Sequence, residues 1–327
     1  MTNRRRRERG IASHVLHTAA ALLCFAPTVM AATADDFSAR LDALWDFDAP
    51  AVSEIRFRDA LTNTTPNSRE AEETATQVAR ALSLQRKFVE ADAVLDGVEP
   101  ALEKLPERVR VRYLLERGRT RNSAGETVRA MPLFEGALAA SGHDALPGAD
   151  FYRVDALHML GIAAPKPQQL DWNLKALAAA DAAADTRARG WRGSLLHNLG
   201  WTYHANGDYA KALDYWQKAL AVREAAGDAG RIEFARWTVA RGLRSLGRLD
   251  EAEAIQRSLA TAMEAAHKPD GYVYEELAEI ALARNDAEAA RPWAAKAYAL
   301  LMDDIWVKAN EPARLARLAR VGGVATP

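Results

Sequence analysis

Residues His197 to Leu220 read HNLGWTYHANGDYAKALDYWQKAL, and this stretch decides the fold. Its first half, together with the preceding Leu196, places small and apolar residues at the spacing of one helix face: Leu196, Leu199, Gly200 and Tyr203. Gly207-Asp208 then interrupts the pattern, as a turn does. The second half has another apolar helical face: Ala212, Trp216, Ala219 and Leu220. The stretch therefore predicts two antiparallel helices joined by a tight turn.

The small residues of this stretch have a packing role in that interpretation. Antiparallel helices approach closely only where their side chains are small, so Gly200 and Ala212 are expected at the point of contact. Trp216 is expected to fill the wider gap beside them.

The same turn-then-alanine pattern occurs in five segments: LQRKFVEADAVL, NSAGETVRAMPLF, ANGDYAKALDYW, SLGRLDEAEAIQ and ARNDAEAARPWA. Their alanines are Ala91, Ala130, Ala212, Ala252 and Ala290, separated by 39, 82, 40 and 38 residues. Because 82 is about two periods, a unit with a degraded pattern is expected between the second and third. The segment DALHMLGIAAPKPQQLDWNLKALAAA has the required helical rhythm on both sides of a break that contains proline. A period of this kind predicts a repeat protein.

At these offsets the sequence resembles the tetratricopeptide repeat, which has small, aromatic and alanine residues at fixed positions. The matching residues of the best copy are Leu196, Leu199, Gly200, Tyr203, Ala212, Trp216 and Ala219. Those of the segment from Val111 are Gly118, Gly125, Ala130, Phe134 and Ala137. Trp216 stands where the family commonly has Phe, and Glu224 replaces the usual closing proline. Arg117 and Arg121 occupy positions where apolar residues are expected, so the register of that helix is open.

The period of about 40 residues exceeds the typical 34, which we attribute to longer second helices or inter-repeat loops. The period alone also allows HEAT-type repeats, but the offsets favour the tetratricopeptide repeat. The resemblance implies an all-α fold, a right-handed superhelical solenoid of antiparallel helix pairs with about six repeats. Pro132 and Pro292 each lie two residues after a repeat alanine, where proline is tolerated only near a helix start. The second helices of those units are therefore expected to begin late or to be kinked.

Four segments are expected along the chain. They are a signal peptide at 1–34, a divergent N-terminal helix pair at 35–69, the repeat array at 70–303, and a C-terminal capping helix and tail at 304–327. A cap is expected because the last hydrophobic face of a solenoid must be covered.

The signal peptide is predicted from a basic head, MTNRRRRERG, an apolar middle and an end of small residues. Cleavage after Ala31 or Ala34 would make the protein periplasmic or secreted. The alternative is an inner-membrane anchor formed by residues 11–32. We favour cleavage because the strongly apolar core, residues 19–26, is short for a membrane span of about 20 residues.

Cleavage changes the composition of the chain. The only cysteine, Cys24, is lost, so the mature protein has no disulfide and no thiolate ligand. Of 43 Lys and Arg and 44 Asp and Glu, five Arg and one Glu leave, so 38 and 43 remain and the net charge is about −5. A net acidic chain argues against nucleic acid as a partner.

No recognised catalytic or nucleotide-binding motif occurs, neither H-E-x-x-H nor G-x-S-x-G nor a phosphate-binding glycine loop. His197 and His204 are seven residues apart, about 10 Å along a helix, so the two alone cannot share a metal ion. We expect no catalytic residues, no metal and no cofactor.

Part of the best copy is not explained by packing. His197, Trp201 and His204 lie at i, i+4 and i+7, a stripe rotated away from the core face. By resemblance, this stripe of each first helix lines the concave groove of the solenoid. The residues predicted to bind a partner there are Arg80, Arg112, Arg119, His158, His197, Trp201, His204, Trp237, Arg241 and Arg244. Aromatic residues and arginine are enriched at protein interfaces.

The predicted function is an exported, non-enzymatic scaffold whose groove binds a protein or peptide. The clustered aromatics also allow a small-ligand or glycan-binding module of the cell envelope, and a hydrolase ranks third. The stripe has a purely structural alternative, in which Trp201 and Trp237 pack against neighbouring helices and the arginines are solvated. Some members of the family clamp a peptide carboxylate with Lys and Asn, but His197 and Trp201 stand at the first two clamp positions. That specificity is therefore not expected.

Overall fold

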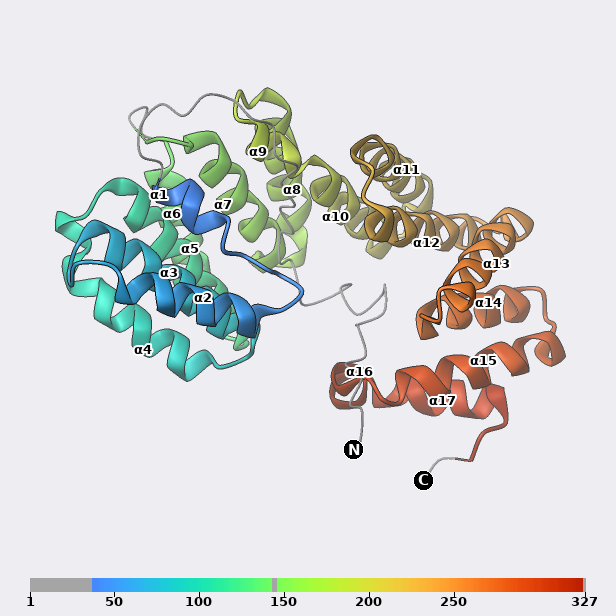
Figure 1. The fold of residues 1–327 in the computed structure, drawn as a ribbon. Helices are drawn as coiled ribbons and strands as arrows, with labels where there is room; N and C mark the ends of the chain where they lie inside the picture. Colours follow the sequence, from blue (N-terminus) through green and yellow to red (C-terminus); the bar gives the residue numbers. More distant parts are fainter. Residues whose placement is uncertain (1–36, 143–145, 326–327) are drawn as a thin grey trace, which may run out of the picture. The chain divides into compact units, whose positions relative to one another are not determined.

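The computed structural model describes residues 37–142 and 146–325, and all regular secondary structure within them is helical (Figure 1). These residues form two compact units, which we call the N-terminal unit (described residues up to 195) and the C-terminal unit (196–325). The boundary falls within α10, Arg192–Ala205, and inside the segment predicted as one repeat array. The predicted signal peptide lies outside the described residues.

The N-terminal unit is built from helices that pair in chain order (Figure 1). Its elements are α1 (Phe37–Asp42), α2 (Pro50–Thr62), α3 (Arg69–Leu84), α4 (Phe88–Val98), the 3-10 helix η1 (Glu99–Lys104), α5 (Glu107–Ser123), α6 (Thr127–Ala140), α7 (Ala149–Ala163), α8 (Lys166–Ala182) and α9 (Thr186–Gly190). The pairs α3–α4, α5–α6 and α7–α8 correspond to successive repeats. The degraded unit is thus a complete helix pair, α7–α8.

The C-terminal unit continues the same order. Its elements after α10 are α11 (Tyr209–Ala226), α12 (Ala229–Ser245), α13 (Leu249–Ala265), α14 (Gly271–Ala283), α15 (Ala287–Leu301), α16 (Ile305–Asn310) and α17 (Pro312–Gly322). With α10–α11, α12–α13 and α14–α15, the described part of the repeat segment contains six helix pairs, as predicted. The predicted basic C-terminal helix is α17, which packs on α15 and buries Leu318 and Ala319.

The turns between paired helices share one backbone feature. A residue with positive φ stands five positions before each repeat alanine: Arg86 (64°), Gly125 (87°), Gly207 (80°), Gly247 (74°) and Asn285 (61°). Glycine adopts this left-handed conformation without steric cost, which explains its use at three of the five positions. After Gly207, the Asp208 carboxylate accepts a hydrogen bond from the backbone N–H of Lys211 and caps α11. The turn predicted from Gly207-Asp208 is confirmed.

The expected close approach in the best copy is also confirmed. A Cβ added at Gly200 would lie 2.3 Å from Nε1 of Trp216, so only glycine fits between α10 and α11. Trp216 is completely buried, and its indole N–H donates to the carbonyl of His197 at 3.1 Å. Gly118 and Phe134 repeat the arrangement between α5 and α6, with 2.5 Å from the added Cβ to the ring.

The structure excludes a late start for two of the second helices, whereas a kink in them stays a prediction, and it explains an arginine at an apolar position. Pro132 and Pro292 lie inside α6 and α15, which begin five residues before them, so neither helix begins late. Both prolines are exposed, so water can reach the carbonyl that loses its helical partner. Arg117 takes an apolar position of α5 because its guanidinium bonds Asp92, Asp96 and Glu99 around α4 and η1.

In the range 37–325, outside the short gap at 143–145, we find no helix that combines the length and the apolar composition needed to cross a bilayer.

Candidate partner-binding surface

The predicted site residues fall into two groups, one in each unit. Arg80, Arg112, Arg119 and His158 belong to the N-terminal unit, and the first three line a single cavity there. The other six, His197, Trp201, His204, Trp237, Arg241 and Arg244, form a continuous cluster on α10 and α12 of the C-terminal unit. We call this second group the α10–α12 stripe and describe it first.

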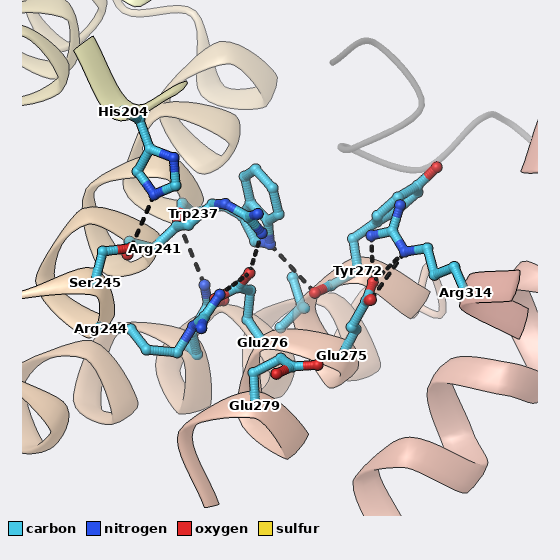
Figure 2. A network of polar contacts seen from close by, with 12 residues as sticks. His204, Trp237, Arg241, Arg244, Ser245, Tyr272, Glu275, Glu276, Glu279 and Arg314 are labelled. Atoms are coloured by element: carbon cyan, nitrogen blue, oxygen red, sulfur yellow. Dashed lines mark hydrogen bonds and ion pairs between the residues drawn. The ribbon is translucent and has the colours of Figure 1, made fainter. Parts of the chain in front are cut away.

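The aromatic side chains of the stripe pack against one another. The Trp201 ring contacts Trp216 edge-on, with centroids 5.1 Å apart, and lies 6.3 Å from Trp237. Its indole N–H donates to Nε2 of His197 at 2.9 Å. Trp237 is buried and donates to the backbone carbonyl of Tyr272 at 3.2 Å (Figure 2). Trp237 therefore packs in the interior of the unit, whereas Trp201 is only partly buried.

The arginines of the stripe are paired rather than solvated. Arg241 and Arg244 both donate to Glu276 of α14, at 2.5 and 2.8 Å (Figure 2). Burial alone would raise the pKa of Glu276, but the two guanidinium groups outweigh it and lower that pKa. Arg241 also lies over the rings of Trp201 and Trp237, 5.3 and 5.8 Å from their centroids. The carboxylate is buried while both arginines keep about a fifth to a quarter of their side chains exposed.

The histidines of the stripe are uncharged near neutral pH. Burial, with Arg241 and Arg244 nearby, lowers the pKa of His204 to about 4, and its Nε2 lies 2.8 Å from the Ser245 hydroxyl (Figure 2). Burial and then Arg223 lower the pKa of His197 well below its usual value. The charge that the stripe offers a partner therefore comes from its arginines.

A second ionic cluster lies in the N-terminal unit. Arg80 donates to Glu116 at 3.0 Å, Glu116 also accepts from Arg119 at 2.7 Å, and Arg119 donates to Asp155. Arg112 donates to Asp42 at 2.7 Å and to the Tyr152 hydroxyl at 3.1 Å, and it lies 3.1 Å from Glu73. These arginines are buried, with 6 to 9% of each residue exposed. Burial lowers the pKa of His158 to about 3, with Arg119 and Arg80 adding to the effect.

Sequence reasoning missed two of the carboxylates that hold these arginines. Glu116 and Glu276 are buried partners of the predicted arginines, yet neither was a candidate. The signal was present as a separation of about one period, since Arg80–Glu116 spans 36 residues and Arg241–Glu276 spans 35. Arg314 of α17 and Glu275 are likewise 39 residues apart and bond at 2.8 Å. Arginine and acid about one period apart therefore mark ion pairs between successive first helices, or between the last first helix, α14, and the C-terminal helix α17.

Helix pairs with a shared alanine position and a left-handed turn define an α-helical repeat protein. Residues 193–226 match the family model described as the tetratricopeptide repeat. Residues 193–226 therefore contain a tetratricopeptide repeat, and the other helix pairs of the described chain share its helical fold. No curated protein sequence matches it.

Solved structures with the same fold cover most of the chain. The apo form of RapI is similar with a TM-score of 0.64 and 10% identity over 88% of this chain and 81% of that one. NprR in complex with its cognate peptide NprX is similar with a TM-score of 0.55 and 13% identity over 90% of this chain and 87% of that one. A tetratricopeptide repeat protein from Parabacteroides merdae has a TM-score of 0.52 and 15% identity over 88% of this chain and 98% of that one. At these identities the likeness is one of fold alone.

Proposed function

We propose that the protein is a non-enzymatic scaffold that binds a protein or peptide partner on the first helices of its repeats. The single observation that carries this proposal is the partly exposed end of the α10–α12 stripe. There Trp201, His204, Arg241 and Arg244 surround one ionic contact whose carboxylate, Glu276, is buried. A guanidinium held over an aromatic ring gives up little conformational freedom on binding, which suits an interface anchor.

The similar fold of NprR, which was solved with its cognate peptide, supports a peptide or protein as the partner. The uncharged histidines and paired carboxylate favour partner groups that accept hydrogen bonds from arginine. The buried members of the predicted set, Trp237 among them, would support the exposed ones rather than touch the partner.

Export is part of the proposal. It rests on the basic and apolar pattern of residues 1–34. The mass of the mature protein, purified from the fractionated host, tests it. Loss of the first 31 or 34 residues supports export, whereas an intact N-terminus in the membrane fraction supports the inner-membrane anchor.

Affinity capture from an envelope extract, followed by mass spectrometry, tests binding. We expect a reproducible partner that is lost when Trp201→Ala and Arg241→Ala are combined. The matched control combines Trp293→Ala and Arg257→Ala, which removes an Arg–Trp contact of 5.6 Å on the second helices α13 and α15 of the same unit. Capture by the folded stripe variant at the wild-type level would contradict the assignment of the surface.

A further inference from the structure

The N-terminal unit contains a small cavity that repeat packing does not explain. Its volume is about 60 Å³, and it is lined by Asp42, Trp45, Phe47, Gln77, Arg80, Arg112, Leu115, Glu116, Arg119, Phe151, Tyr152, Asp155, Arg187 and Trp191. Most of the charged lining residues are buried. A water-sized group needs on the order of 15 Å³ measured in this way, so the cavity has room for roughly four such groups.

One wall of the cavity comes from outside the first helices. Trp45 and Phe47, between α1 and α2, stack with their centroids 4.6 Å apart, and the Trp45 indole donates to Gln77 at 3.0 Å. The guanidinium of Arg80 lies 5.8 and 5.7 Å from the centroids of these two rings. Trp191, which follows α9, lines the cavity as well. Aromatic rings and an arginine thus enclose a space beyond what helix pairing requires.

Two buried donors in the lining have no hydrogen-bond partner among the residues that the structure describes. They are Nε of Arg119 and the indole Nε1 of Trp191. These residues are 9 and 3% exposed, so water outside the protein does not satisfy them. An unsatisfied buried donor costs about 1–3 kcal/mol, and an acceptor inside the cavity would remove that cost. Among the fully buried side-chain atoms of the described lining residues, the unsatisfied ones are both donors, so an occupant that accepts hydrogen bonds fits this site.

The electrostatics around the donors favour an acceptor with negative charge. Arg80 and Arg119 share Glu116, and Arg119 also pairs with Asp155, while the whole lining holds four arginines against three carboxylates. These charges also affect the pKa of His158, whose ring centroid lies 4.8 Å from that of Trp191. Burial is the main cause of its low pKa, and the nearby positive charges of Arg119 and Arg80 lower the pKa further.

We infer that this cavity binds a carboxylate carried on a short apolar stem, with the Trp191 indole and the Arg119 guanidinium as donors. Acetate and the side chain of an aspartate on a bound peptide share this chemistry and fit the volume. The peptide source rests on the proposed function, whereas the cavity's affinity for a free acid does not.

Acetate titrated into the full chain is the test, with the indole N–H resonances followed by NMR. Trp191→Phe assigns the reporter, since it removes only that N–H and keeps the ring. We expect acetate to shift the Trp191 resonance in a saturable way and acetamide, its neutral counterpart, not to do so. No saturable shift with acetate, or an equal one with acetamide, would overturn the inference.

Binding of ¹³C-labelled acetate, observed on the ligand, supplies the second measurement. Trp191→Phe should weaken it roughly ten-fold, as expected for loss of one hydrogen bond to a charged group. The matched control Trp172→Phe alters a tryptophan of α8 that does not line the cavity and should change nothing. Equal affinity in wild type and Trp191→Phe would overturn the inference.

N-acetylaspartic acid α-amide then separates the sources. Binding of it supports a peptide side chain, and binding of acetate alone supports a free acid. Acetate binding without a captured partner would contradict the proposed function only, and a captured partner without acetate binding would contradict the cavity only.

Discussion

Arg80 Nη1 donates to Glu116 Oε2 at 3.0 Å and joins the first helices of two successive repeats. Arg241 and Glu276 repeat this contact in the other unit. Both arginines stand 11 residues before a repeat alanine, and both glutamates stand 14 before the alanine of the next repeat. The same ion pair is thus used at equivalent positions, where a buried charge needs a partner in a fixed register.

Glu116→Gln should destabilise the N-terminal unit strongly. The change leaves Arg80 and Arg119 buried with less compensating charge, and breaking a buried ion pair costs about 3–5 kcal/mol. Urea unfolding, followed by circular dichroism, measures the loss. The control Glu126→Gln removes a carboxylate that is 39% exposed and pairs with Arg129 and Arg121 near the surface, where about 1 kcal/mol or less per pair is expected. Equal losses in the two variants would contradict a structural role for the buried pair.

His158 should make the protein sensitive to mild acid. Burial, with Arg119 and Arg80, lowers its pKa to about 3 in the folded chain, against about 6.5 when unfolded. Below pH 6.5 the His158 imidazole binds a proton in the unfolded chain, whereas in the folded chain it stays neutral until the pH approaches 3. Its contribution to the free energy of unfolding is therefore complete above pH 6.5 and falls as the pH drops towards 3. At pH 5 this residue alone accounts for about 2 kcal/mol.

Unfolding free energies of His158→Gln at pH 7 and pH 5 test the sign and the size of this effect. The difference between the two pH values should shrink by about 2 kcal/mol relative to wild type. The exposed His267, replaced by Asn, should leave it unchanged. An undiminished pH dependence in His158→Gln would show that the protonation of another group controls acid stability.

The helix pairs could be predicted from sequence because their determinants are local. Gly200, Ala212 and Trp216 meet across one turn, so their offsets within a single repeat carry the contact. The left-handed turns follow in the same way from residues five positions before each alanine. The types of residue and their spacing suffice to predict a contact where the interacting residues lie within about twenty positions of each other.

The candidate surface was harder to predict because the pairing of its arginines depends on carboxylates of the next repeat. Arg241 is paired because Glu276, 35 residues further along the chain, lies within hydrogen-bond distance of it. Its guanidinium also lies over the rings of Trp201 and Trp237. The cavity depends further on Trp45 and Trp191, which belong to no repeat position. The repeat period does not predict such residues, because they lie outside the positions that recur from repeat to repeat.

Arg86→Gly should stabilise the protein, since Arg86 has a φ of 64° at the position where three other repeats use glycine. A left-handed residue with a side chain costs about 1–2 kcal/mol, and Arg86 is exposed. We expect a gain of about 1 kcal/mol in urea unfolding, reduced by loss of the weak contact with the Phe88 ring at 5.5 Å. Gly125→Arg, the reverse exchange at the equivalent turn, should lose a similar amount. A gain in both variants would contradict the equivalence of the turns.

Gly200→Ala should destabilise the pair α10–α11, because the new methyl group would lie 2.3 Å from Trp216 Nε1. Overpacking of a filled core costs about 1–3 kcal/mol, measured here as a lower urea midpoint. Trp216→Phe in the same chain should recover part of the loss, since the smaller ring leaves room for the methyl group. The matched control is Gly97→Ala in α4, where an added Cβ meets nothing within 4 Å. That exchange should instead stabilise by about 0.5–1 kcal/mol through helix propensity. If Gly200→Ala were as favourable as Gly97→Ala, the helices would not be in the close contact from which the fold was deduced.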